Sequence, residues 1–113
     1  MHNDTAASFN ELRDEIYADD IAHGLWREGD DPTDCSWLVK NEAEELDEAA
    51  DAWCESGWDE EENEEFAEEL ADVVIMCMSV AGHLGIDIGA AILRKVEINR
   101  RRPWKHGKEA LGR

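Results

Sequence analysis

The sequence predicts an all-α fold, a bundle of four to five helices. Apolar residues recur at spacings of three and four in successive runs, which is the helical period. Gly and Pro separate these runs, and the chain has only two prolines. With 113 residues and 42% apolar side chains, the chain can build one core but not two. We therefore expect residues 1–113 to form a single folded domain.

The first helix is expected to run from Asp4 or Thr5 to about Trp26 or Arg27, and residues 28–34 read as a loop. The second helix should start with Thr33 or Asp34 as its cap and end before Gly57. The next helix should begin at Asp59, where Glu62 three residues later fits a capping box, and end at Gly85. The last should be capped by Asp87 and reach about Arg101, before Pro103.

The third predicted helix changes character along its length. Its first turns are nearly all acidic, whereas VVIMCMSVAGHLG in its second half is nearly all apolar. A helix that is apolar on every side is buried on every side. In so small a domain this favours a core that is completed by oligomerisation, as a homodimer or homotetramer. Residues 104–113 are expected to form a basic tail that is partly mobile.

The charge is uneven. The net charge is −18, yet residues 1–80 carry 3 basic and 26 acidic side chains while residues 81–113 carry 8 basic and 3 acidic. So acidic a body should repel nucleic acid, and no nucleic-acid partner is expected. The three cysteines lack CxxC spacing, no apolar run could span a membrane, and the amino terminus lacks the pattern of a signal peptide. We expect a cytoplasmic protein with no membrane partner.

Two acidic quartets organise the chain. Glu42 and Glu45 are three residues apart in the second predicted helix, as are Glu69 and Asp72 in the third. Residues three apart share a helix face, so an antiparallel hairpin can bring all four carboxylates together. Clustered carboxylates repel one another unless a cation lies among them. Oxygen ligands favour Mg²⁺, Mn²⁺ or Ca²⁺ over zinc or copper, and a di-iron site would want Glu-x-x-His pairs. The spacing predicts a site for one of these hard cations, and our interpretation is a magnesium site whose ion holds polyphosphate.

The order of these motifs resembles the MazG-like family of nucleoside triphosphate pyrophosphohydrolases over roughly residues 33–104. The matching positions are Leu38, Glu42, Glu45, Leu46, Glu69, Asp72, Val73, Val74, Gly85, Ile86, Asp87, Ile88, Lys95, Asn99 and Arg102. The resemblance implies a helical oligomer that hydrolyses (deoxy)nucleoside triphosphates to the monophosphate and pyrophosphate with Mg²⁺, for which Mn²⁺ can substitute. Its role would be control or sanitation of the nucleotide pool. The residue at position 41 is Asn, where many members have a further acid.

The resemblance also implies roles for individual residues. The metal ligands would be Glu42, Glu45, Glu69 and Asp72. The proton of the attacking water would pass to a carboxylate of this cluster, Glu42 or Glu45, between which the sequence does not choose. The phosphates or sugar would be met by Lys95, Asn99 and Arg102, and the base by Trp26 and Trp53.

Two other function classes fit parts of the sequence. A very acidic helical protein could mimic the charge of DNA and bind a basic partner without catalysis. That reading explains the net charge but not the basic last third. A helical-bundle subunit without chemistry is the third alternative, and Mg²⁺ would then leave its melting temperature unchanged. The DNA-mimic reading also leaves the apolar second half of the third predicted helix unexplained.

Overall fold

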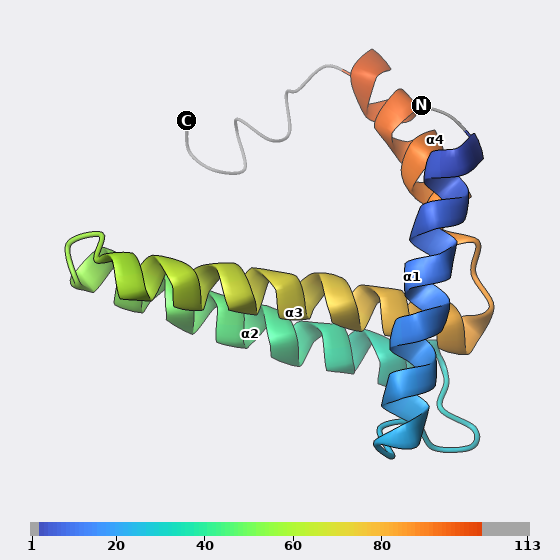
Figure 1. Ribbon diagram of the computed structural model, residues 1–113, viewed down its shortest axis with the longest axis horizontal. Helices are drawn as coiled ribbons and strands as arrows, with labels where there is room; N and C mark the ends of the chain where they lie inside the picture. Colours follow the sequence, from blue (N-terminus) through green and yellow to red (C-terminus); the bar gives the residue numbers. More distant parts are fainter. Residues whose placement is uncertain (1–2, 103–113) are drawn as a thin grey trace.

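The computed structural model describes residues 3–102, which form four helices and no strand. These are α1 (Asn3–Ala22), α2 (Pro32–Glu55), α3 (Glu60–Leu84) and α4 (Ile88–Arg101). The longest two, α2 and α3, form an antiparallel hairpin, and α1 crosses one end of it (Figure 1). The predicted all-α fold is confirmed. The predicted tail, residues 104–113, lies outside the described residues.

The α2–α3 hairpin begins at a proline and turns at a glycine. Asp31 caps α2, and Pro32 occupies the first turn, where a missing N–H costs nothing. The Asp31 carboxylate accepts hydrogen bonds from two backbone N–H groups of the first turn. In return, the backbone N–H of Asp31 donates to the Asp34 carboxylate at 3.0 Å. The helix therefore starts earlier than predicted. The turn into α3 places Gly57 at φ 75° and Trp58 at φ 70°.

Asp59 precedes the first residue of α3 as predicted, but one predicted cap interaction and one predicted helix end were wrong for local reasons. The predicted capping box of α3 does not form, because Asp59 makes no side-chain bond to the first turn. The first helix ends at Ala22, several residues before the predicted Trp26 or Arg27. Gly24, at φ 80°, reverses the chain, and the Leu25 N–H donates to the Asp20 carbonyl. This early end releases the following residues to pack against α3.

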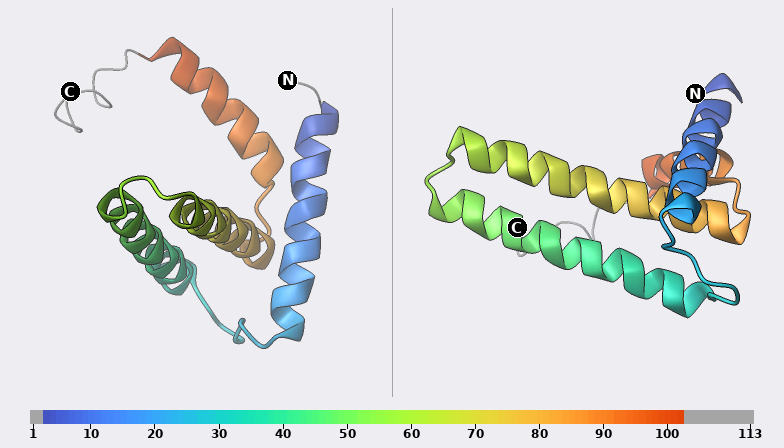
Figure 2. Two further views of the ribbon diagram at one scale, coloured as in Figure 1. Left: turned by 60° about the vertical axis from the view of Figure 1, so that its left-hand side comes forward. Right: turned by 60° about the horizontal axis from the view of Figure 1, so that its bottom comes forward.

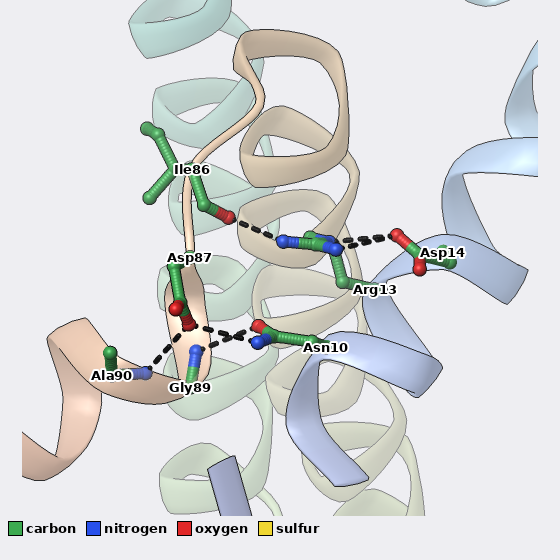
Figure 3. A network of polar contacts seen from close by, with 7 residues as sticks. All are labelled: Asn10, Arg13, Asp14, Ile86, Asp87, Gly89 and Ala90. Carbon is green, nitrogen blue, oxygen red and sulfur yellow. Dashed lines mark hydrogen bonds and ion pairs between the residues drawn. The ribbon is translucent and has the colours of Figure 1, made fainter. Parts of the chain in front are cut away.

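A polar network ties α1 to the turn between α3 and α4 (Figure 3). Asn10 donates to the Asp87 carboxylate at 2.8 Å and accepts from the Gly89 N–H at 2.9 Å. Arg13 donates to the Ile86 carbonyl at 2.7 Å. Asp87 also caps α4 through the Ala90 N–H, as the sequence predicted. The result is that α4 packs on α1, and Figure 2 shows both helices to one side of the hairpin.

The core of one chain is small. Among the described residues only a few side chains are fully buried, and they are small or flexible: Cys35, Ala49, Met78, Ser79 and Ala81. The apolar half of α3 is not covered on every side, since Leu70 and Val74 are each 48% exposed and Ile75 is 41% exposed.

Taken singly, no helix between residues 3 and 102 has the length and apolar character to cross a membrane, although the bent pair α3–α4 passes that test of length and composition.

Candidate functional site

Three carboxylates meet midway along the hairpin. Glu42 comes from α2, while Glu69 and Asp72 come from α3, and one oxygen of each lies within 4.8 Å of the others. Helix periodicity explains the meeting, because residues three apart on α3 face the same way and α2 runs antiparallel beside it. The sequence predicted that these three would converge, and the geometry brings them together.

Repulsion and burial both act on this group. Burial raises the pKa of the Glu42 carboxyl, and so do the charge of Glu45, a hydrogen bond shared with Glu45, and the charges of Asp72 and Glu69. Burial also raises the pKa of Glu69, followed by the charges of Glu45 and Asp72. The arrangement is electrostatically costly for carboxylates without a counter-charge.

The donor set fits a hard divalent cation. The Oε2 atom of Glu69 is buried and has no hydrogen-bond partner among the described residues. Within residues 3–102, no Lys or Arg forms an ion pair with any of the three carboxylates. A buried carboxylate oxygen with no partner is costly, whereas carboxylate oxygens are the ligands that Mg²⁺ and Mn²⁺ prefer. The residues present would satisfy such an ion.

Glu45 lies beside this group but is not among the three residues whose oxygens lie within 4.8 Å of one another. It is exposed, and its charge acts on both Glu42 and Glu69. It lines an open hollow of about 540 Å³ on the hairpin. The lining is mostly acidic: Glu45, Glu48, Ala49, Ala52, Glu62, Glu65 and Glu69. Its role as a fourth metal ligand stays a prediction, and its exposure leaves it free to meet a substrate.

Trp26 is anchored in an aromatic cluster where the loop after α1 meets α3. Its indole stacks on the His83 ring at 4.1 Å between centroids and donates to the Ser79 hydroxyl at 2.9 Å. His83 Nε2 lies 2.9 Å from the Asp30 carbonyl oxygen, which can only accept, so Nε2 carries a proton. In the neutral ring, Nδ1 then accepts from the Tyr17 hydroxyl. These contacts fix the loop to α3, and a role for Trp26 at the base stays a prediction.

Trp53 lies at the opposite end of the hairpin. Its ring packs on Trp58 at 5.1 Å and on Phe66 at 5.3 Å between centroids. Its buried Nε1 has no hydrogen-bond partner in the described part of the chain. The two tryptophans predicted to contact the base are therefore in separate clusters, one on each side of the carboxylates along the hairpin. The predicted role of Trp53 is likewise untested.

The predicted phosphate and sugar contacts lie on α4. Lys95 is exposed, Asn99 is half-buried, and Arg102 follows the last helical residue. Because α4 packs on α1 and not along the hairpin, the structure does not bring these three side chains into contact with the carboxylates. Their role in binding stays a prediction.

Sequence reasoning missed a cavity of about 320 Å³ at the start of α2. It is lined by Leu25, Arg27, Asp30, Asp34, Trp37 and Leu38. One signal for it was present in the sequence. One face of α2 leads from this cavity to the carboxylates. It carries Asp34, Leu38 and Glu42, each four residues after the one before.

The fold and site together define a class: an all-α protein whose central hairpin presents a carboxylate cluster suited to a divalent cation. The comparisons with known proteins specify the family. A model of the MazG-like family matches residues 38–110, about two thirds of the chain, and the protein belongs to this family. The chain is also similar to human dCTP pyrophosphatase 1, with 40% identity over 50 residues. That match covers 44% of this chain and 29% of the human protein. No solved structure matches the chain.

Proposed function

We propose that this protein is a hydrolase that converts (deoxy)nucleoside triphosphates to the monophosphate and pyrophosphate, with Mg²⁺ as its cofactor and Mn²⁺ as a possible substitute. The observation that carries the proposal is the group formed by Glu42, Glu69 and Asp72, whose oxygens lie within 4.8 Å of one another. Membership of the MazG-like family and the similarity to a dCTP pyrophosphatase support it.

The three grouped carboxylates would hold the ion. When bound, Mg²⁺ supplies positive charge that offsets the charge on phosphate oxygens. The residues themselves contribute a rigid frame, because Glu42 is fixed on α2 and Glu69 and Asp72 are fixed on α3. The buried Oε2 of Glu69 gains the partner that it lacks within the chain.

Glu45 is the carboxylate best placed to accept a proton. It is exposed, and it borders the hollow beside the cluster. In the proposed reaction, water attacks the α-phosphorus and forms a new P–O bond. The bond from that phosphorus to the α–β bridging oxygen breaks, and pyrophosphate leaves with the electron pair. The Glu45 carboxylate takes the proton that the water releases.

The basic and polar residues of α4, which do not contact the carboxylates within one chain, would approach the substrate from another side. Lys95 and Arg102 would meet phosphate oxygens, and Asn99 would meet the phosphates or the sugar. The exposed apolar side chains of α3, Leu70 and Val74, favour a homodimer or homotetramer in which a second subunit covers them. The proposed setting is the cytoplasm, with control or sanitation of the nucleotide pool as the role and no nucleic acid as partner.

One experiment tests the function. Each of the eight common nucleoside triphosphates is incubated with the protein and Mg²⁺, and pyrophosphate release is measured. Glu42→Gln should abolish release, because it removes one ligand charge from the cluster. Glu44→Gln is the matched control, since Glu44 is an exposed acid on the same helix and outside the group. If the wild-type protein releases no pyrophosphate, or Glu42→Gln releases it normally, the proposal is wrong and a non-catalytic acidic binding protein becomes the better account.

A further inference from the structure

The turn that joins α2 to α3 carries aromatic side chains at the end of the hairpin away from α1 (Figure 1). Trp53 and Trp58 meet edge to face at 5.1 Å between ring centroids, and Phe66 packs on Trp53 from α3. Trp58 is nevertheless 65% exposed, so most of its ring faces solvent. Exposed tryptophan rings are often the centre of a contact with another protein. We call residues 51–62 the hairpin tip.

The backbone at Trp58 is unfavourable for so large a side chain. Gly57 and Trp58 follow one another with positive φ, 75° and 70°. Glycine adopts this left-handed conformation freely, whereas a bulky residue there is a genuine outlier. Because most of the Trp58 ring is exposed, packing within one chain offsets little of this cost. A second glycine would suit the turn better, so the turn itself does not explain the tryptophan.

The acids of the hairpin tip are a second unfavourable feature. They are Asp51, Glu55, Asp59, Glu60, Glu61 and Glu62, and residues 51–62 contain no Lys, Arg or His. None of them forms an ion pair within residues 3–102. The helix dipole favours the glutamates in the first turn of α3. It disfavours Glu55, which is the last residue of α2, in a final turn without a basic side chain. The tip therefore lacks a positive counter-charge.

A guanidinium group suits both features. It is planar and positively charged, so it stacks on an indole ring while its N–H groups donate to carboxylates. We propose that the hairpin tip binds an arginine-rich segment of another protein, with Trp58 as the stacking surface and the surrounding carboxylates as counter-charges. The exposed arginines of α4, Arg100 and Arg101, already pair with Glu97, so another protein is a better partner than a second copy of this chain.

Calorimetric titration with two synthetic peptides tests this inference without any nucleotide. One peptide alternates Arg with Gly, and the other has Lys in place of each Arg. Salt at about 0.15 M screens the general attraction of a cation to so acidic a chain. The wild-type protein should bind the Arg peptide about 2- to 5-fold more tightly than the Lys peptide, which is the factor expected from one exposed cation–π contact that Arg makes better than Lys.

Variants of the hairpin tip locate the binding. Trp58→Gly should bind the two peptides equally, and it should fold because glycine adopts positive φ freely. Trp58→Asn, which also tolerates this conformation, should do the same, and circular dichroism checks both folds. Glu55→Gln should weaken binding of the Arg peptide more than Glu15→Gln does. The latter is the matched control, since Glu15 is an exposed acid on α1, at the other end of the hairpin.

The other outcomes would overturn the inference. These are equal binding of both peptides by the wild-type protein, an unchanged Arg preference in folded Trp58→Gly and Trp58→Asn, or equal weakening by Glu55→Gln and Glu15→Gln. A lower molar mass of Trp58→Gly in light scattering would show that the tip is a contact between copies of this chain. The inference is independent of the proposed function, because a protein that releases no pyrophosphate but prefers the Arg peptide through Trp58 would refute only the latter.

Discussion

Gly89, at the start of α4, lies directly against the backbone of α1, and replacing it by Ala tests how α4 is positioned. A Cβ atom at this position would lie 2.7 Å from the Cα and carbonyl carbon of Ala6 and closer still to its carbonyl oxygen. All three are backbone atoms, so no side-chain rotation relieves the contact. The Gly89 N–H also donates to Asn10 at 2.9 Å. The substitution must therefore push α4 away from α1.

The size of the effect follows from opposing contributions. Overpacking of a close contact costs about 1–3 kcal/mol, and the loss of the Asn10 hydrogen bond costs about 0.5–1.5 kcal/mol. Alanine recovers about 0.5–1 kcal/mol, because glycine is the poorer residue within a helix. The net loss of unfolding free energy for Gly89→Ala should be about 0.5–4 kcal/mol. In a domain of this size that lowers Tm by roughly 2–16 °C.

Urea and thermal unfolding, followed by circular dichroism, measure this loss. Ala90→Ser is the control, because Ala90 is the exposed neighbour of Gly89 and a surface change there should stay within about 0.5 kcal/mol. If Gly89→Ala were as stable as the wild-type protein, or more stable through its better helix propensity, the close packing of α1 on α4 would be refuted. The argument that α1 sets the position of α4 would fail with it.

Three further predictions concern the cap, the exposed apolar face and the aromatic cluster. The hydrogen bond from the Ala90 N–H holds the pKa of Asp87 below its ordinary value. The ionised Asp87 therefore stabilises the fold fully at pH values above its ordinary pKa, and this contribution decreases as pH falls through the lowered pKa. Asp87→Ala should therefore lower the urea midpoint more at pH 6 than in acid, and a difference from the wild-type protein that does not narrow as pH falls below the ordinary aspartate pKa would contradict this. Val74→Arg should lower the molar mass measured by light scattering, whereas an unchanged mass would exclude this face from the subunit interface. Ser79→Ala removes the acceptor of the Trp26 indole and should cost about 1 kcal/mol with a shift in tryptophan emission; unchanged emission would show that the bond does not form in solution.

The sequence predicted the helices best where one residue alone sets the boundary. Gly85 ends α3 at φ 67°, and Asp87 caps α4 with its side chain, as expected. The end of α1 could not be predicted, because Leu25 and Trp26 continue its apolar stripe while Gly24 reverses the chain. Tertiary contacts decided between these signals. The indole of Trp26 gains a stacked ring and a hydrogen bond on α3 only if the helix stops earlier.

The candidate site was predictable in part for a similar reason. Spacing by three places Glu69 and Asp72 on one face of α3, and an antiparallel partner helix brings Glu42 opposite them. Spacing does not fix how far each helix turns about its own axis, so it could not show that Glu45 would be exposed beside the close group; its role as a fourth ligand stays a prediction. The cavity at Asp34 and Trp37 was out of reach of periodicity, because the loop residues that close it have no regular period.

The central claim is that Glu42, Glu69 and Asp72 hold a divalent cation. Mn²⁺ binding, followed by electron paramagnetic resonance, measures this directly and needs no substrate. The wild-type protein should bind Mn²⁺ saturably and release it to Mg²⁺. Glu69→Gln should lose most of this affinity, while Glu68→Gln, an exposed acid one residue away, should retain it. Identical Mn²⁺ binding by all three proteins would show that the acidic surface attracts cations without a defined site, and would contradict the account.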